Sequence, residues 1–254
     1  MDKKYFLNFM KEMDENKLIK LWGDIKLSES IDYPIVTTEF YPPGIWSKLK
    51  NINGMTFLTK GLTEESEKKV IIIIPKNYSG EIPDFNLVYF KINGKNKFKN
   101  LLHKDFLGTI MSLGIKREIL GDLIVKDNIS YGVIFQENYK IVENIDRISN
   151  VPVKVELAKE DEVPKTNFKK IIITISSLRL DSVISGIVNI SRQRGADEII
   201  KGNIMVNYVI NKEKSIEIKE GDIISIRKFG KFKIGDEISI NKKGKIRISI
   251  KEYI

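Results

Sequence analysis

Cationic side chains stand at the starts of two consecutive segments with helical spacing near the C-terminal end of the chain. Arg179 opens the first segment, and Arg192 and Arg194 lie at the start of the second. The first turn of a helix exposes backbone N–H groups, and a guanidinium can form two parallel hydrogen bonds to a phosphate. Cations gathered at helix starts therefore predict a binding site for a phosphate-bearing polymer.

Two helices and the strands that follow them must position these cations. In the first predicted helix the apolar residues follow the spacing of an amphipathic helix: Leu180, Val183, Ile184, Ile187 and Val188. Ser191 is suited to cap the second helix, because its hydroxyl can accept a hydrogen bond from an otherwise unpaired backbone N–H. Gly202 suits the left-handed position that ends this helix. Short strands are predicted over 205–208 and 223–226.

The net charge of +9 over 254 residues is unevenly distributed. Residues 176–254 contain sixteen lysines and arginines against ten aspartates and glutamates, which leaves +6 on this part. A local positive field attracts polyphosphates and speeds their association. The many Ile, Lys and Asn residues suggest an AT-rich genome, which raises the lysine content for no functional reason. The local clustering therefore carries more weight than the total charge.

The order of short motifs in this span is more specific than any one of them. R-L-D begins at Arg179, S-R-Q at Ser191, K-G at Lys201, V-N at Val206 and E-G-D at Glu220. This ordered set resembles the S4 RNA-binding domain, a small module that places two helices against structured RNA. The resemblance implies that the C-terminal part of the chain binds RNA.

The earlier segments predict an α+β protein with three domains. Residues 1–68 form an N-terminal helical and mixed region, with an apolar helical stripe over 1–21 and a strand over 55–59. Residues 69–158 follow the order β-β-α-β-β-α-β, which predicts a central RRM-like α+β sandwich, although the aromatic RNP signature of an RRM is absent. A charged stretch around Pro164 predicts a linker over 159–173, before a C-terminal domain over 174–254.

Within the central domain, strands are expected at 70–74, 85–92, around 124, at 129–135 and at 151–157, and helices at 103–113 and 137–148. The segment from Phe106 to Asp122 reads F-L-G-T-I-M-S-L-G-I-K-R-E-I-L-G-D, and His103 and Lys104 precede it. This segment resembles the signature of the YlmH-type S4-domain proteins of bacteria. In that family an N-terminal region and a central α+β domain precede a C-terminal S4 domain.

The family resemblance also implies a function. It indicates an RNA-binding protein that acts on the large ribosomal subunit with peptidyl-tRNA, in ribosome-associated quality control, and a link to cell division. We expect the arginines to contact phosphates, and the other polar and cationic residues to extend the surface. The complete predicted set is Arg179, Asp181, Ser191, Arg192, Gln193, Arg194, Lys201, Arg227, Lys228 and Lys231.

Two positions depart from the family pattern, and a second group of residues is a further candidate RNA contact. Gly195 stands where the family usually has alanine, and Glu198 where it has an aliphatic residue. The second candidate contact consists of His103, Lys104, Lys116 and Arg117. A helix-ending turn with solvated charges explains Lys116 and Arg117 equally well. A single histidine at a helix start is more often a cap or a surface residue than a catalytic base.

Several classes of catalysis lack the residues they need. The absence of cysteine excludes thiolate chemistry and disulfides, and one histidine is too few for a typical zinc site. The two common glycine-rich phosphate loops do not occur, and no G-x-S-x-G elbow accompanies His103. We therefore expect no metal, no cofactor and no enzymatic activity.

Two alternative functions stay open at this point. R-L-D-S-V-I-S-G from Arg179 resembles the catalytic R-L-D-x-x-T-S-G of pseudouridine synthases, in which the aspartate is the nucleophile, although too little chain follows for a catalytic domain. An adaptor that binds a protein, for example a division component, through its central domain is the other alternative. The principal expectation is a cytoplasmic monomer without a membrane span. Its partners are structured rRNA, tRNA as a further candidate, and the large ribosomal subunit.

Overall fold

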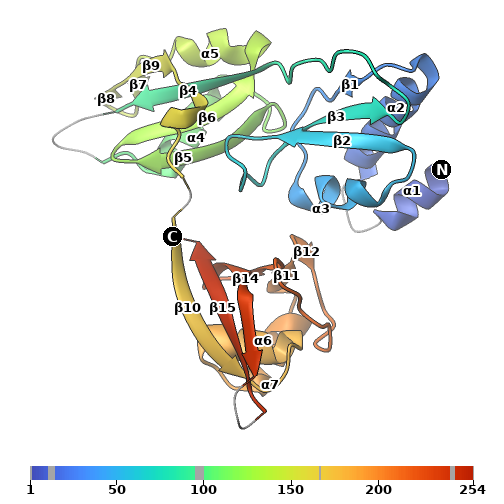
Figure 1. The fold of residues 1–254 in the computed structure, drawn as a ribbon. Coiled ribbons are helices and arrows are strands. Elements are labelled where there is room, and N and C mark those ends of the chain that lie inside the picture. The colour runs from blue at the N-terminus through green and yellow to red at the C-terminus, as the bar shows by residue number, and fades with distance from the viewer. Residues whose placement is uncertain (1, 11–14, 95–99, 166, 241–243, 254) are drawn as a thin grey trace. The chain divides into compact units, whose positions relative to one another are not determined.

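The computed structural model describes residues 2–10, 15–94, 100–165, 167–240 and 244–253 of the chain. The chain divides into two compact units, Met1–Lys165 and Thr166–Ile254. Both units combine helices with antiparallel strands, so the protein is of the α+β class (Figure 1). Within the described residues, no helix has both the length and the apolar character needed to cross a membrane.

The first unit begins with a three-stranded sheet and its helices. Its elements are α1 (Lys3–Phe9), α2 (Glu15–Ile31), β1 (Ile35–Val36), α3 (Pro43–Trp46), η1 (Lys48–Asn51), β2 (Met55–Lys60) and β3 (Val70–Pro75). The strand order is β1-β3-β2, so β3 is the central strand, and all of its residues are buried. A strand that is buried on both faces requires a continuous run of β-branched residues, which V-I-I-I-I supplies.

The position of β3 contradicts the predicted domain boundary at residue 69. β3 pairs with β2 from Lys60↔Val70 to Met55↔Pro75, and it pairs with β1 on its other edge. The sequence pattern reveals a strand here but not its neighbours, because hydrophobicity alone does not identify a pairing partner. Residues 1–68 without β3 would leave β1 and β2 unconnected, so they do not form a domain by themselves.

The remainder of the first unit follows the order β-α-β-β-α-β. Its elements are β4 (Leu87–Asn93), α4 (His103–Ser112), β5 (Leu120–Lys126), β6 (Ile129–Phe135), η2 (Gln136–Asn138), α5 (Tyr139–Glu143), β7 (Arg147–Ile148), β8 (Val151–Pro152), β9 (Lys154–Leu157) and η3 (Glu160–Glu162). The main sheet has the order β5-β6-β4-β9, with all neighbours antiparallel. Phe106 and Ile110 of α4 and Val142 of α5 belong to the core on one face of this sheet.

Three predicted elements differ from the structure in their extent. The helix predicted over 137–148 ends at Glu143, because residues 147–148 pair with 151–152 in the small β7-β8 sheet. The strand predicted over 151–157 is divided into β8 and β9. The helix predicted over 1–21 corresponds to α1 and the start of α2, and residues 11–14 between them lie outside the described residues.

The second face of the four-stranded sheet is also covered. Phe40, Leu62 and Val70, from the N-terminal part of the chain, share a buried cluster with Val133 and Phe135 of β6. The rings of Phe40 and Phe135 meet edge to face, with their centroids 5.3 Å apart. The two sheets therefore share a hydrophobic core, which explains why residues 1–165 form one unit.

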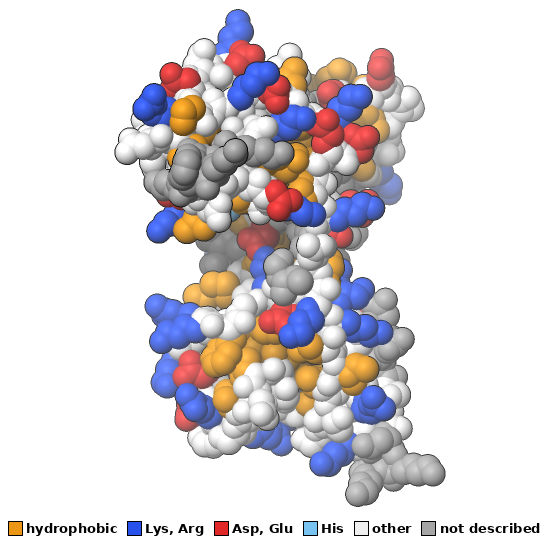
Figure 2. Space-filling model, turned by 90° about the vertical axis from the view of Figure 1, so that its left-hand side faces the viewer, with side chains coloured by type: hydrophobic (Ala, Val, Ile, Leu, Met, Phe, Trp, Pro, Cys, Tyr) orange, Lys and Arg blue, Asp and Glu red, His pale blue; other side chains and the backbone are white. Residues whose placement is uncertain are grey.

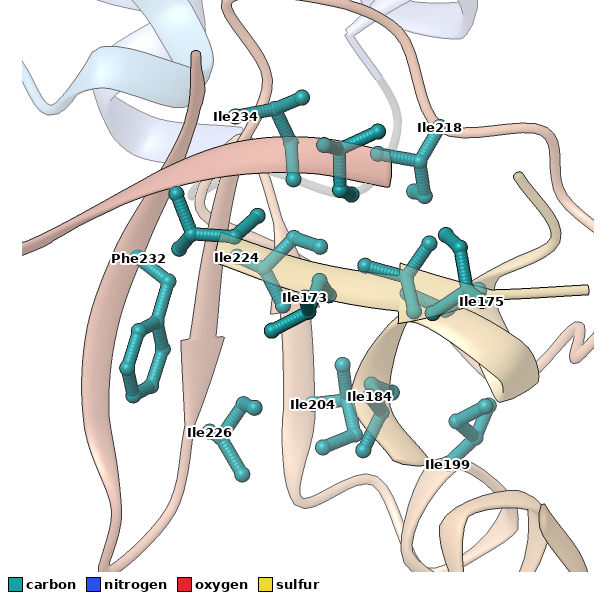
Figure 3. Close-up of a cluster of buried hydrophobic side chains, with 14 residues drawn as sticks. Ile173, Ile175, Ile184, Ile199, Ile204, Ile218, Ile224, Ile226, Phe232 and Ile234 are labelled. Carbon is teal, nitrogen blue, oxygen red and sulfur yellow. The ribbon is translucent and has the colours of Figure 1, made fainter. Parts of the chain in front are cut away.

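The second unit contains two helices and a six-stranded sheet. Its elements are β10 (Phe168–Ile175), α6 (Leu180–Val188), α7 (Arg192–Ile200), β11 (Ile204–Val206), β12 (Val209–Ile210), β13 (Ile223–Ile226), β14 (Gly230–Ile240) and β15 (Ile246–Tyr253). The strand order is β10-β15-β14-β13-β11-β12. Figure 3 shows isoleucine side chains of the sheet, such as Ile173 and Ile224, lying against Ile184 of α6 and Ile199 of α7.

The predicted linker over 159–173 is shorter in the structure. β10 begins at Phe168 and pairs with β15 over its whole length, from Phe168↔Tyr253 to Ile175↔Ile246. The high proportion of lysine in residues 165–170 conceals the start of this strand in the sequence. In the structure, the later residues of β10 alternate between exposed and more buried positions. The division between the two compact units falls between Lys165 and Thr166.

Gly121 of β5 lies at the contact between the two sheets of the first unit. A Cβ atom at this position would overlap the Val133 side chain and would lie 3.0 Å from the Phe40 ring. Gly108 of α4 is the opposite case, because no atom lies within 4 Å of the position of its Cβ.

The variant Gly121→Ala should therefore destabilise the first unit by about 1–3 kcal/mol, because it overpacks the shared core. Gly108→Ala is the matched control and should be neutral or stabilising by up to about 1 kcal/mol, because alanine favours the helix. Urea unfolding followed by tryptophan fluorescence measures both changes, since Trp22 and Trp46 lie in the first unit. Equal stabilities for the two variants would contradict the shared core.

Candidate nucleic-acid interface

The α6-α7 pair is formed by local signals that the sequence shows. The Ser191 hydroxyl accepts a hydrogen bond from the Arg194 N–H at 3.2 Å, which confirms Ser191 as the cap of α7. Gly202, with φ +74°, adopts the predicted left-handed conformation after this helix. Asn189 ends α6 in the same conformation, with φ +52°. The chain can therefore turn sharply between the helices and bring their N-terminal ends together.

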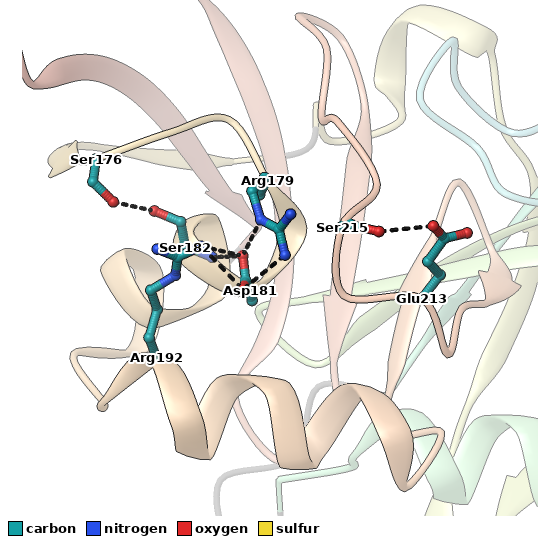
Figure 4. Close-up of polar contacts among 7 residues, drawn as sticks. All are labelled: Ser176, Arg179, Asp181, Ser182, Arg192, Glu213 and Ser215. Atoms are coloured by element: carbon teal, nitrogen blue, oxygen red, sulfur yellow. Dashed lines mark hydrogen bonds and ion pairs between the residues drawn. The ribbon is translucent and has the colours of Figure 1, made fainter.

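Asp181 lies where the two helix starts meet (Figure 4). Asp181 is only 6% exposed to solvent. Nη2 of Arg192 donates to both carboxylate oxygens at 3.1 Å, and Arg179 donates to them from Nε at 3.3 Å and Nη2 at 3.4 Å. The Ser182 N–H donates to Oδ1 at 2.9 Å. Asp181 therefore joins two arginines from two different helix starts around one carboxylate.

The protonation of Asp181 reflects two opposing effects. Burial of the carboxyl raises its pKa, but the hydrogen bonds and charges of Arg179 and Arg192 outweigh burial, so the pKa lies below 3.8. The carboxylate is therefore ionised at neutral pH and holds both guanidinium groups. Their side chains are still 40% and 48% exposed, which leaves donors of both arginines facing solvent.

Gly195 explains the close approach of the two helices. A Cβ atom at this position would lie 3.2 Å from the backbone oxygen of Asp181 and 3.7 Å from Cγ2 of Ile184. The family's usual alanine would therefore fit only with a shift of a few tenths of an ångström between the helices. Glycine at this position allows α7 to lie tightly against α6.

A basic groove lies beside α7, with a volume of about 510 Å³. Four predicted cations line it, together with one carboxylate, one amide and two apolar side chains: Arg194, Lys201, Arg227, Lys228, Glu198, Asn203, Ile190 and Phe229. The four cations are exposed, and Phe229 is 50% exposed at the turn between β13 and β14. Cations beside an exposed aromatic ring can bind phosphates and stack a base.

Glu198 lies within this groove and not in the packed face that the family pattern suggests. It accepts hydrogen bonds from Asn203 at 2.7 Å and from Lys201 at 3.0 Å. These two contacts hold the pKa of Glu198 below its ordinary value. Nη1 of Arg227 in turn donates to Asn203 Oδ1 at 3.4 Å. One carboxylate thus orders part of the cationic lining.

The turn between β13 and β14 has an unusual backbone. Lys228 has φ +72°, a left-handed conformation that is uncommon for a residue other than glycine, asparagine or aspartate. A conformation of this kind costs free energy and is retained where surrounding structure or function requires it. Here it places Lys228 and Phe229 at the edge of the groove. Phe229 and Asn203 are not in the set predicted from the sequence, although an aromatic residue between lysine and glycine in R-K-F-G is a usable signal.

Six residues of the predicted set do not line the groove. Four of them lie at the helix starts described above, and the other two are Gln193 and Lys231. Gln193 is exposed and donates from Nε2 to Asp197 at 3.2 Å. Lys231 lies on β14 with its ammonium over the rings of Tyr208 and Tyr253, at 5.3 and 4.9 Å from the ring centroids. Burial lowers the pKa of Lys231. Lys231 was predicted as an extension of the same surface, and the structure places it in a different environment.

The second predicted contact, in the first unit, separates into two parts. His103 and Lys104 are exposed in the first turn of α4. Nη1 of Arg117 instead donates to the carbonyls of Leu120 and Gly121, both at 3.1 Å. The Arg117 guanidinium therefore holds the turn before β5, which favours the structural interpretation for this residue. Lys116 beside it is exposed.

Asp122, at the end of the central motif, has a similar structural role. Its Oδ2 accepts hydrogen bonds from the backbone N–H groups of Glu67 at 2.7 Å and Lys68 at 3.1 Å. Nζ of Lys68 donates to the carbonyls of Arg117 and Leu120, and burial lowers the pKa of Lys68 to about 8. These contacts tie the segment before β3 to β5.

The molecular surface of the C-terminal unit is rich in cations. Figure 2 shows one face of the molecule, on which lysine and arginine side chains surround a hydrophobic patch in the lower half of the picture. Among the described residues, no group of three or more histidine, aspartate or glutamate side chains is arranged to hold a metal ion.

Comparisons with known proteins extend this description. Residues 81–162 match a family model described as "Putative RNA-binding domain in YlmH". The ribosome-associated protein quality control protein P2 of Bacillus subtilis (strain 168) is 26% identical over 205 residues, which cover 78% of this chain and 80% of that protein. The resemblance to the YlmH-type proteins is confirmed. The matched range 81–162 lies within the first unit and begins after β3.

A solved structure was also found. The cell division protein YlmH from Streptococcus pneumoniae is 28% identical and covers 59% of this chain and 93% of that chain, with a TM-score of 0.49.

The variant Asp181→Asn should destabilise the C-terminal unit by about 1–2 kcal/mol at neutral pH, because both arginines lose their shared carboxylate. The folded pKa lies below the ordinary value of 3.8, so this contribution is present above 3.8 and is lost as the pH falls through the folded pKa. Urea unfolding followed by far-UV circular dichroism, with tryptophan fluorescence as the control for the first unit, measures the effect. A stability difference that persists undiminished in strong acid would contradict the ion pairs.

Proposed function

We propose that this protein is a non-enzymatic RNA-binding protein of ribosome-associated quality control, which docks on structured RNA of the large ribosomal subunit. The observation that carries the proposal is the groove beside α7, where four exposed cations surround an exposed phenylalanine. The match of residues 81–162 and the printed name of the Bacillus subtilis relative support it. A cytoplasmic location follows from this role.

The domain assignment that fits this function is an S4-type C-terminal unit. The S4 motifs R-L-D and S-R-Q lie at the starts of α6 and α7, and Asp181 links the two starts. In this proposal Arg179 and Arg192 use their solvent-facing donors for phosphates, and Asp181 positions them. Electrostatic capture comes first, and docking of the helix pair against the shape of a folded RNA gives specificity.

The central part of the chain is proposed to be RRM-like in strand order but not in its mode of binding. An RRM stacks bases on aromatic residues of an open sheet face. Here the equivalent face of β6 is packed against Phe40, Leu62 and Val70. An RNA contact of the first unit therefore has to use another surface, and His103 and Lys104 at the exposed start of α4 are the proposed residues.

The alternative reading of Asp181 as a pseudouridine synthase nucleophile has an observation against it. Both carboxylate oxygens accept hydrogen bonds from arginines, and the residue is buried. A nucleophile needs an oxygen that can reach the substrate. We therefore assign Asp181 a positioning role.

The variant Arg194→Gln with Arg227→Gln should release the protein from large ribosomal subunits in sucrose-gradient sedimentation. Two lost phosphate contacts should weaken binding at physiological salt and reduce the slope of affinity against salt by about one unit each. Lys169→Gln with Lys219→Gln removes the same charge from exposed positions outside the groove and should sediment as the wild type does. We call the double variant Arg194→Gln, Arg227→Gln the groove variant. If it sediments with the large subunit as the wild type does, the groove is not the binding site.

The wild type and Asp181→Ala should release equally little tritium from ribosomal RNA labelled in its uridines. The reason is that Asp181 is buried and its carboxylate is bound by arginines. A known pseudouridine synthase is the positive control for the assay. Tritium release by the wild type that disappears in the variant would establish the enzyme instead of the binding protein.

A further inference from the structure

The sheet of the C-terminal unit has a second face, opposite to the one that packs against α6 and α7. Side chains alternate between the two faces of a strand. Ile173 of β10, Ile250 of β15 and Ile234 of β14 point into the core, so the residues of the other parity lie on the outer face. We define the outer face by six of them and by Tyr208, whose ring contacts the Lys231 ammonium. The six strand residues are Phe168, Lys170, Lys231, Lys233, Lys251 and Tyr253.

Three lysines lie in one row across the outer face. Lys170 of β10 is paired directly with Lys251 of β15, and Lys251 is paired directly with Lys233 of β14. The Cβ atoms of residues paired in this way are only about 5 Å apart. Lys170 is exposed, and the other two are half-buried. Like charges directly opposite each other repel, so the pairing concentrates positive charge in one row of the outer face.

An aromatic row runs beside the lysine row. The rings of Phe168 and Tyr253 meet edge to face with centroids 4.8 Å apart. The Lys231 ammonium lies between the rings of Tyr253 and Tyr208, at 4.9 and 5.3 Å from their centroids. All four side chains of this row are half-buried: Phe168, Tyr208, Lys231 and Tyr253. Since the two rows are two residues apart along each strand, about 7 Å separates them.

We propose that the outer face is a second RNA-binding surface, which takes a single-stranded segment with its phosphates along the lysine row and its bases against the aromatic row. Charge complementarity supports a polyanion, because Lys251 has a lysine on each side. The aromatic row favours nucleic acid over an acidic protein, because bases of any sequence stack on aromatic rings. This surface is independent of the groove beside α7, which is proposed for structured RNA.

The test uses the full chain, a fluorescein-labelled oligoadenylate and fluorescence anisotropy over a range of salt concentrations. Lys233→Gln with Lys251→Gln should weaken binding severalfold at low salt and reduce the salt slope by about 1.4, which is ~0.7 for each lost contact with a single strand. The same variant should keep or raise the melting temperature, because two lysine–lysine contacts disappear. Tyr253→Leu should weaken binding about tenfold through lost stacking.

Lys169→Gln with Lys219→Gln is the control, since it removes the same charge, and Lys169 lies on β10 with the opposite parity to Lys170. The proposal is overturned if Lys233→Gln with Lys251→Gln binds oligoadenylate with the same affinity and the same salt slope as this control. If Tyr253→Leu binds oligoadenylate as the wild type does, and the wild type binds polyglutamate equally tightly, the ligand of the outer face is an acidic protein and not RNA.

The result can be separated from a failure of the proposed function. Failure of the groove variant to leave the ribosomal subunit counts against the groove alone. If the wild-type protein sediments with subunits through the groove but does not bind oligoadenylate, only the proposal for the outer face fails.

Discussion

The ion pairs of Asp181 determine how the helices of the C-terminal unit meet. One buried carboxylate accepts from Arg179 and Arg192, which belong to separate helix starts. Without it, the two guanidinium groups would lie close together with no shared counter-charge. Gly195 permits the tight contact that the ion pairs require. These two features, together with the buried Ala196 and Ile199 of α7, place this helix and the groove beside it.

A comparable constraint holds the first unit together. Phe40 and Val70 pack against β6, and Asp122 accepts from the backbone of Glu67 and Lys68. Apolar packing and a buried polar network therefore connect the same two sheets. Arg117 and Asp122, which carry part of the central sequence signature, act within this network. That part of the signature describes how the sheets are joined, whereas His103, Lys104 and Lys116 are exposed.

Local signals predicted most of the secondary structure, because caps and spacing act over a few residues. Ser191 and Gly202 illustrate this, since each fulfils its predicted role. Pairings between distant segments were not predictable in the same way. β3 shows a clear strand pattern, yet nothing in it indicates that its neighbours are β1 and β2. Lys231 follows Arg227 and Lys228 closely in sequence, but strand alternation separates it from the groove.

Glu198 gives the groove a property that a count of cations does not convey. With one ionised carboxylate held by Asn203 and Lys201, the groove has an internal polarity. An RNA bound there, as we propose, would have to keep its phosphates away from Glu198 and could turn a base amino group toward it, since amino groups of cytosine donate to carboxylates. The departure from an aliphatic residue therefore makes the lining sensitive to the orientation of its ligand, which a uniformly positive surface cannot be.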